Sequence, residues 1–290
     1  EGEADIVEEI LRIYGFDQIP LTNVSDHNNK KNVLSAELKS FYKIKRAIAN
    51  TGYIEAVTWS FMDEKIAKIL SANVIMIKNP ISADLNVMRP SNIPNLLTSI
   101  NLNKSKMITS GKIFEVGPIF DETLEDKQVN VATGIGYGNV AGNNWNSPKK
   151  DFDVFAIKSD LMIILKSLNA PIDNLNYEAI NNKIFHPGKS SSLRIGKNII
   201  ANFGELNPIL LKSLDVSNTV VAFEIFTETL AQFQNKKTST ISAFDNNPFQ
   251  MVERDFAFLL PKSIKANNIV NKIKKIDKKI INKVSIFDVY

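Results

Sequence analysis

The stretch from residue 79 to residue 121 constrains the fold of this chain most, because its predicted helix lies between two strand-forming runs, one just before the stretch and one at its end. A short apolar run at 74–77 leads into it and ends at Asn79-Pro80, a dipeptide typical of turns. A second run, at 113–120, is rich in Ile, Phe and Val and carries Gly117-Pro118, where we expect a bend. The pattern predicts a strand, a helix and a returning strand around a polar junction, an arrangement that many folds contain.

The helix of this stretch is predicted from its first turn. Ser91 or Asn92 can accept hydrogen bonds from the free N–H groups at its start, and Pro94 fixes the backbone there. We expect its buried side to consist of four aliphatic residues, Leu96, Leu97, Ile100 and Leu102.

The composition bounds the class of protein. With 290 residues, 44% hydrophobic content and a mean hydropathy of −0.09, the chain can build one large or two ordinary globular domains. The absence of cysteine excludes disulfide scaffolds, thiolate zinc sites and cysteine nucleophiles. No apolar run approaches the roughly 20 residues of a membrane helix, and the acidic N-terminus is unlike a signal peptide. We expect a cytoplasmic protein without membrane contact and, because the sequence opens within a helix, a piece of a longer chain.

Charge is distributed unevenly along the chain. The formal net charge is +4, yet residues 1–20 carry six acids against Arg12 alone. Residues 241–290 carry nine basic residues against five acids, so the net excess lies in the last fifty residues. This basic region is either a nucleic-acid surface or a solvated face of a lysine-rich sequence, and the second interpretation is the commoner one.

An acidic helix is predicted at 4–14, where a broad apolar side ends at a glycine, Gly15. Asp5, Glu8, Glu9 and Arg12 recur at spacings of three, four and seven and therefore share one face. Three carboxylates within about one turn repel one another and need compensation. Arg12 can supply it as a salt bridge, or a hard divalent cation such as Mg²⁺ can bind the carboxylates. Spacing alone favours the salt-bridged, solvent-facing helix.

The middle of the chain alternates helices and strands. A polar connector at 21–32 precedes an amphipathic helix at 34–48, which ends before Gly52. The alternation of Val57, Trp59 and Phe61 with polar residues predicts an antiparallel strand at 55–61 with one buried face. The remaining predictions are a glycine-bearing strand at 131–138, a helix at 152–168 buried along Phe155, Leu161, Ile164 and Leu165 or their neighbours, a hairpin at 185–207 and a strand at 219–226.

Two local patterns suggest chemistry that their context does not support. The glycines at 131–138 are not followed by a helix, as a nucleotide-binding loop requires. His186 and Ser190 invite a hydrolase interpretation, but no strained nucleophile turn is present. A structural histidine in a tight turn is the better interpretation of His186.

The last segment follows a polar linker at 238–249 and has a different rhythm. It predicts a strand at 254–260, a helix at 264–276 and a strand at 284–290. Such a strand, helix and strand form half of a split β-α-β unit.

Six phrases in order resemble the β subunits of bacterial phenylalanyl-tRNA synthetases, over nearly the whole chain. They are DIVEEILRIYGFDQIP (5–20), NPIS…MRPSNIPNLL (79–97), KIFEVGPIF (112–120), FHPGKSSSLRIG (185–196), FGELNP (203–208) and PFQMVERDFAF (248–258), with FDVY at the close. The resemblance implies three parts. They are the end of a preceding B5-like domain at 1–20, a non-catalytic core module at 33–235 and a truncated anticodon-binding domain at 241–290.

The same resemblance implies a fold and a function. The fold would be α+β, with a class II synthetase-like antiparallel sheet flanked by helices, plus the first half of a ferredoxin-like domain. The chain would support a catalytic α subunit in an α₂β₂ phenylalanine–tRNA ligase and contact tRNA(Phe), with ATP used by the α subunit. Asp5, Glu8 and Glu9 match Mg²⁺ ligands of the family, whose further aspartate would precede Glu1, so the site would be incomplete here.

A missing positive charge decides the expected role. Catalytic class II modules hold the ATP phosphates with arginines after one strand and within a later glycine-rich element. Here those places read Phe120-Asp121-Glu122 and AFEIF at 222–226, without a cation. Because an acid beside a triphosphate is repulsive, we expect no ATP site in this chain. The alternative function is a stand-alone basic nucleic-acid-binding protein that uses the last fifty residues.

Overall fold

The computed structural model describes residues 2–21, 34–124, 128–140, 145–146, 148–234, 250–277 and 279–289. The chain divides into two compact units, Glu1–Lys39 and Ser40–Tyr290. All but residue 21 of the connector predicted at 21–32, and all of the linker predicted at 238–249, lie outside the described residues. Among the described residues no helix is long and apolar enough to cross a membrane.

The first unit contains the predicted acidic helix, α1 (Glu3–Tyr14), which a short 3₁₀ turn, η1 (Phe16–Gln18), follows. The helix ends where expected, since Gly15 has a φ of 102° and its N–H donates to the carbonyl of Leu11 at 2.8 Å. Glycine adopts this positive φ without steric cost. No residue of α1 is buried.

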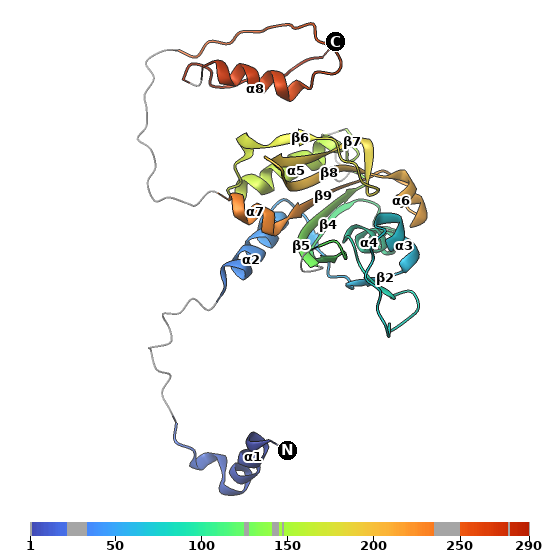
Figure 1. Ribbon diagram of the computed structural model, residues 1–290, viewed down its shortest axis with the longest axis vertical. Helices are drawn as coiled ribbons and strands as arrows, with labels where there is room; N and C mark the ends of the chain where they lie inside the picture. The colour runs from blue at the N-terminus through green and yellow to red at the C-terminus, as the bar shows by residue number, and fades with distance from the viewer. Residues whose placement is uncertain are drawn as a thin grey trace. The chain divides into compact units, whose positions relative to one another are not determined.

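The second unit is organised around a seven-stranded sheet in the order β1-β4-β5-β9-β8-β7-β6 (Figure 1). Only the β1–β4 pair is parallel, and the other neighbouring pairs are antiparallel. This confirms the predicted α+β class with a large, mostly antiparallel sheet. The strands are β1 (Ile54–Glu55), β4 (Gly111–Phe120), β5 (Gln128–Tyr137), β6 (Asn176–Glu178), β7 (Phe185–Ile195), β8 (Asn198–Leu206) and β9 (Val220–Phe226).

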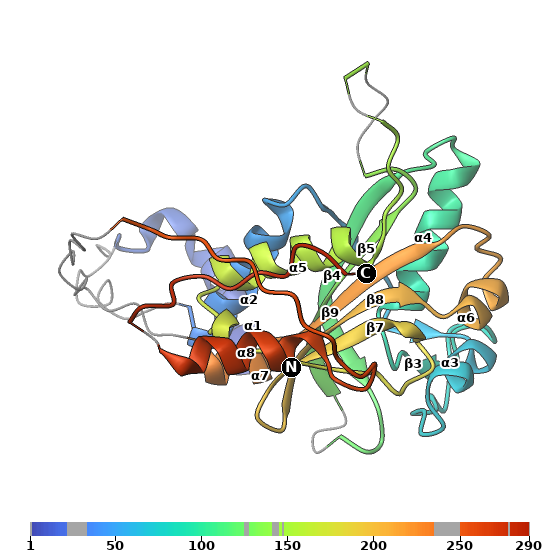
Figure 2. The ribbon, with the colours of Figure 1, turned by 90° about the horizontal axis from the view of Figure 1, so that it is seen from above.

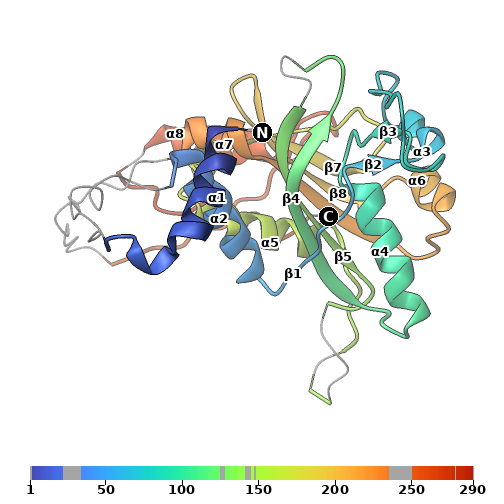
Figure 3. The ribbon, with the colours of Figure 1, turned by 90° about the horizontal axis from the view of Figure 1, so that it is seen from below.

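Helices cover both faces of this sheet (Figures 2 and 3). One apolar cluster joins one face to side chains of α2, α5 and α7, and a second joins the other face to α4 and α6. Burial of these two clusters is the main stabilising term, because free energy follows the apolar area removed from water. The helices are α2 (Ala36–Ala49), α4 (Ile93–Ser105), α5 (Val154–Ser167), α6 (Pro208–Ser213) and α7 (Thr227–Phe233).

A smaller layer stands beside the main sheet. Two short strands, β2 (Phe61–Met62) and β3 (Val87–Met88), pair antiparallel, and α3 (Glu64–Leu70) packs with them in a third apolar cluster. The side chain of Asp63 caps α3 by accepting from the N–H of Lys65 at 2.6 Å. A 3₁₀ turn, η3 (Ile172–Asn174), precedes β6.

The glycine-bearing stretch at 131–138 forms most of β5, as predicted. A Cβ atom on Gly134 would collide with the ring of Phe223, and one on Gly136 would lie 2.8 Å from Cδ1 of Phe152. These glycines therefore make room for aromatic rings on the α5 face. The predicted hairpin at 185–207 is also confirmed, as β7 and β8 with a turn at Gly196, whose φ is 59°.

The antiparallel strand predicted at 55–61 is wrong. Only Ile54–Glu55 joins the sheet, in parallel with β4, and the chain then leaves to form β2. Val57 is 86% exposed and Trp59 is 64% exposed. The reason is that Thr58, between them, turns inward to a buried carboxylate of β4, which directs its neighbours outward. The strand predicted at 74–77 is likewise reduced to an isolated bridge between Met76 and Val87.

Two residues predicted to be buried face solvent. Leu102 is 61% exposed, whereas the other three aliphatic residues named for α4 are fully buried. Phe155 is 74% exposed, and Ile157 takes its place on the buried side of α5. Both exceptions lie two positions from a buried residue, and two positions on a helix point to opposite sides.

The final segment contains the predicted helix as α8 (Ala266–Ile276), but not the predicted strands at 254–260 and 284–290. No strand forms within residues 250–277 and 279–289. The two outer strands of a split β-α-β unit are separated in the sheet by another strand. The described part of this segment contains no such middle strand. The two predicted outer strands would therefore have no neighbour to pair with.

Candidate functional site

A row of buried polar side chains crosses the main sheet on the face that carries α4. It consists of Glu115 on β4, Thr133 on β5, Glu224 on β9, Asn202 on β8 and Ser192 on β7. Each is directly opposite the next in the strand register, so all five project from the same face. None is more than 6% exposed. We refer to these five residues as the polar row.

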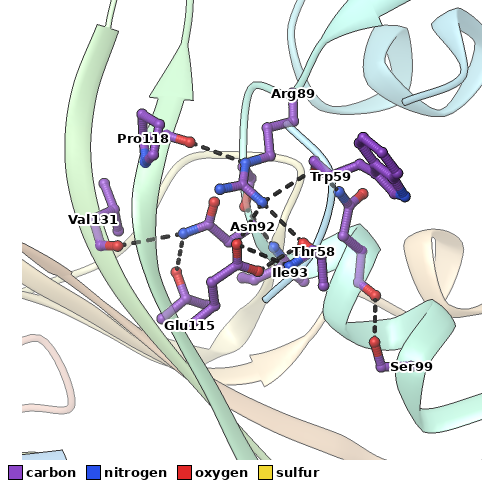
Figure 4. A network of polar contacts seen from close by, with 12 residues as sticks. Thr58, Trp59, Arg89, Asn92, Ile93, Ser99, Glu115, Pro118 and Val131 are labelled. Atoms are coloured by element: carbon purple, nitrogen blue, oxygen red, sulfur yellow. Dashed lines mark hydrogen bonds and ion pairs between the residues drawn. The ribbon is translucent and has the colours of Figure 1, made fainter. Parts of the chain in front are cut away.

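The β4 end of the polar row is filled by Arg89, which lies between β3 and α4 and is 1% exposed (Figure 4). Its Nη1 donates to Glu115 Oε1 at 2.8 Å and to Thr58 Oγ1 at 2.9 Å, and its Nε donates to the carbonyl of Pro118 at 3.0 Å. A Cβ on Gly117 would lie 2.7 Å from Nη2 of this arginine. One end of the guanidinium therefore lies against β4, in space that a glycine leaves open.

Further hydrogen bonds fix the loop between β1 and β2 to this arginine. The hydroxyl of Thr58 donates to Glu115 Oε2 at 2.7 Å, and the carbonyl of Trp59 accepts from Arg89 Nη1 at 3.3 Å and from Asn95 Nδ2 at 2.5 Å. Figure 4 shows these contacts converging from the loop, β4 and α4. Both charges are buried, and each is also hydrogen-bonded to neighbouring groups. Arg89 and Glu115 therefore form a buried ion pair.

Asn92 joins the start of α4 to the middle of the row. Its Nδ2 donates to the carbonyl of Val131 at 3.3 Å and to Thr133 Oγ1 at 3.4 Å. Its Oδ1 is buried and makes no hydrogen bond within the described residues. Of the two predicted caps, Ser91 is the one whose side chain bonds the helix, because its hydroxyl accepts from the N–H of Ile93 at 3.2 Å.

The second carboxyl of the row, Glu224, has a different environment. Its Oε1 accepts a hydrogen bond from the hydroxyl of Ser91 at 2.9 Å, and the residue is 4% exposed. Burial raises the pKa of Glu224 to about 7, against the smaller opposing effect of the Ser91 hydrogen bond. Next to it, Asn202 Oδ1 accepts from the hydroxyl of Ser192 at 2.6 Å.

Asp121, named from sequence as the acid at a phosphate-binding position, follows the end of β4. Its Oδ2 accepts from the hydroxyl of Ser71 at 2.7 Å, and its Oδ1 accepts from the N–H and hydroxyl of Thr123 at 2.9 and 2.6 Å. Partial burial opposes ionisation, but these hydrogen bonds outweigh it and lower the pKa of Asp121 below its usual value. The side chain is therefore an anion at neutral pH.

The three predicted metal ligands lie on α1 and have protein partners of their own in two cases. Asp5 Oδ2 accepts from the N–H of Gly2 at 2.7 Å, and Glu9 Oε2 pairs with Arg12 at 2.8 Å. Glu8 is exposed. In the ranges that the structure describes, no three His, Asp or Glu side chains are grouped as a metal site. Carboxylates are suitable ligands for Mg²⁺. The arrangement of side chains on α1 matches the salt-bridged helix, and Mg²⁺ binding by Asp5, Glu8 and Glu9 stays a prediction.

The hydrolase alternative is wrong. The Nδ1 of His186 accepts from the N–H of Gly188 at 3.0 Å, while the hydroxyl of Ser190 donates to the backbone carbonyl of His186 at 2.6 Å. The ring and the hydroxyl each bond to nearby backbone, so neither activates the other. The structural role of this histidine is confirmed, but it lies in β7, at the register shift between Phe185 and Ser190, and not in a turn.

Sequence reasoning missed Arg89 and the role of Glu115. The available signal was a glutamate inside an apolar strand, KIFEVGPIF at 112–120 and again AFEIF at 222–226. A buried carboxyl has to be paired or neutral. Each of these glutamates therefore predicts either a cationic partner elsewhere in the chain or a protonated carboxyl.

Comparison with known proteins agrees with this architecture. Residues 19–227 match the family described as phenylalanyl tRNA synthetase beta chain CLM domain, and residues 247–290 match the ferredoxin-fold anticodon binding domain. The chain belongs to the phenylalanyl-tRNA synthetase β-chain family. Phenylalanine–tRNA ligase beta subunits from Rhodospirillum rubrum and Bartonella quintana are 35% and 37% identical over all of this chain. The chain spans 36% and 37% of their lengths, about a third of each.

The fold extends to a more distant synthetase. A pyrrolysyl tRNA synthetase from Desulfitobacterium hafniense superimposes with a TM-score of 0.53 at 13% identity, over 70% of each chain. At this identity the likeness shows the fold alone. Family membership over the full chain does not support the alternative of a stand-alone basic nucleic-acid-binding protein.

Proposed function

We propose that this β-chain family member acts as the non-catalytic part of a phenylalanine–tRNA ligase and supports a catalytic α subunit in an α₂β₂ assembly. The observation that carries the non-catalytic role is the buried ion pair of Arg89 and Glu115 at the β4 end of the polar row. A buried guanidinium already committed to a carboxylate, a hydroxyl and two carbonyls is not available to a phosphate.

Asp121 supports the same role. Its low pKa keeps it charged, and a carboxylate at the end of β4 repels a triphosphate. Glu224 adds a buried side chain without a cation where the later arginine of catalytic modules was expected. ATP is therefore assigned to the partner α subunit.

The proposed division of the chain is the end of a preceding B5-like domain at 1–20, the class II synthetase-like core module at 33–235 and an anticodon-binding part at 241–290. The last part carries the basic excess and is the proposed contact with tRNA(Phe). A ligase of this kind works in the cytoplasm. In the complete subunit Mg²⁺ would be held by Asp5, Glu8 and Glu9 with a further carboxylate from the preceding residues.

The test is phenylalanine-dependent exchange of pyrophosphate into ATP, measured on the 290-residue chain with and without a co-expressed catalytic α subunit. We expect the two chains to co-purify and exchange to occur only in samples containing α. Exchange by this chain alone, free of α, would contradict the non-catalytic role. Failure of the two chains to associate would contradict the subunit role separately.

A further inference from the structure

Glu224 is enclosed by neighbours that carry no charge. β5 presents Thr133 on one side and β8 presents Asn202 on the other, while Ser91, before α4, contacts the carboxyl itself. The Ser91 hydroxyl is its hydrogen-bond donor. Among the described residues no salt bridge reaches Glu224. An ionised carboxylate in this place would be a buried charge without compensation.

The charged groups on the same line of the sheet are already paired elsewhere. Glu115 and Arg89 bind each other on the far side of β5, and Glu178 pairs with Arg194 at 3.1 Å near the opposite end, beyond β8. Neither pair contributes a free cation to β9. Thr133 and Asn202 instead offer oxygen atoms, which can accept a hydrogen bond from a protonated carboxyl group.

We infer that Glu224 is held in the folded chain as a neutral carboxylic acid. A proton removes the charge of this carboxyl, whereas Arg89 balances the charge of Glu115. The module then takes up a proton when it folds, and its stability depends on pH. Because Ser91 bonds both Glu224 and the first N–H of α4, ionisation of Glu224 acts on the junction between α4 and the sheet. This inference concerns the fold and does not rest on the proposed ligase function.

The direction of the pH effect follows from the shift. The pKa of Glu224 is about 7 in the folded chain, against an ordinary value of 4.5. Between these values the unfolded chain has lost the proton and the folded chain has kept it, so the folding equilibrium constant falls by up to tenfold for each pH unit. Its favourable contribution is complete below pH 4.5, is lost as pH rises to about 7, and changes no further above that.

The test compares denaturant unfolding of the 290-residue chain and its E224Q variant from about pH 5 to about pH 8. Glutamine keeps the shape and a hydrogen-bond donor but cannot ionise. We expect E224Q to gain stability relative to wild type as pH rises, by on the order of a hundredfold in the folding constant. The matched control is E178Q, because Glu178 lies on the same line of the sheet but is half exposed and paired. Its difference from wild type should not change over this range.

A pH-independent difference between E224Q and wild type would overturn the inference. A measurement on the wild-type chain decides the matter if E224Q fails to fold. With ¹³C-labelled glutamate, NMR should show one carboxyl resonance titrating near neutral pH. If no glutamate carboxyl of the folded chain titrates near neutral pH, Glu224 is ionised and the inference is wrong.

Discussion

Two buried glutamates of the polar row, one at its β4 end and one in its middle, are accommodated by different means. Glu115 on β4 and Glu224 on β9 are each 4% exposed and project from the same face of the sheet. Glu115 is bound by the guanidinium of Arg89 and two groups of Thr58, whereas Glu224 has a hydroxyl from Ser91. Two carboxyls of equal burial therefore have different hydrogen-bond partners, a cation for Glu115 and a neutral hydroxyl for Glu224.

The largest effect is expected for R89A, which leaves Glu115 buried without its cation. Breaking a buried pair by removing one partner costs about 3–5 kcal/mol, so the free energy of unfolding at neutral pH should fall by that amount. Denaturant unfolding measures it. The matched control is R12A, which removes an exposed pair on α1 and should cost less than about 1 kcal/mol. A loss from R89A as small as that of R12A would contradict the importance of the buried pair.

A second, smaller loss is expected for G117A, because the added methyl group would meet Arg89 Nη2 at 2.7 Å. Overpacking of a filled core costs about 1–3 kcal/mol. The effect should depend on the arginine, so G117A introduced into R89A should cost much less than G117A alone. Unfolding of the four chains as a double-mutant cycle gives this coupling. Equal costs in both backgrounds would show that the methyl group strains something else.

In the middle of the row, S91A should lower the free energy of unfolding by about 1 kcal/mol, since it removes one hydrogen bond to a carboxyl and the contact with the first N–H of α4. The same change should raise the pKa of Glu224 further, because the Ser91 hydrogen bond, which lowers this pKa, is lost. A shift of the Glu224 titration to lower pH in S91A would contradict the arrangement. S105A, in the exposed last turn of α4, is the control and should leave the titration unchanged.

The smallest effect is expected for H186A, which removes one exposed hydrogen bond at the register shift of β7. We expect the free energy of unfolding to fall by less than about 1 kcal/mol, with the fold retained. Urea unfolding of H186A beside wild type measures this loss. A loss comparable to that of R89A would mean that this part of β7, and not only the polar row, holds the sheet together.

Local patterns were enough for much of the fold. The helix α1 and its end at Gly15, the helix α2 and the β7–β8 hairpin all follow from periodicity and turn residues close together in the sequence. The strands predicted around α8 failed for a reason outside any local pattern, since a strand needs a neighbour to pair with. The predicted burial of Val57 and Trp59 is wrong because the intervening Thr58 has a hydrogen-bond partner, Glu115, on β4.

The site was harder to predict because its contacts span long sequence distances. Arg89 and Glu115 are 26 residues apart, and Ser91 and Glu224 are 133 apart. The sequence around Asp121 and in AFEIF shows the absence of an arginine, but neither segment contains the partner of its own buried glutamate. The spacing of Asp5, Glu8, Glu9 and Arg12 showed the shared face of α1, and the structure adds which of these side chains bond to each other.

The proposed absence of an ATP site rests on the polar row, where Arg89 is already paired with Glu115 and, among the described residues, no cation pairs with Glu224. Calorimetric titration of the 290-residue chain with ATP and Mg²⁺ tests it most directly. We expect no saturable binding up to about 1 mM, the upper end of ordinary substrate affinities. Saturable binding that weakens when residues of the polar row are replaced would contradict the claim.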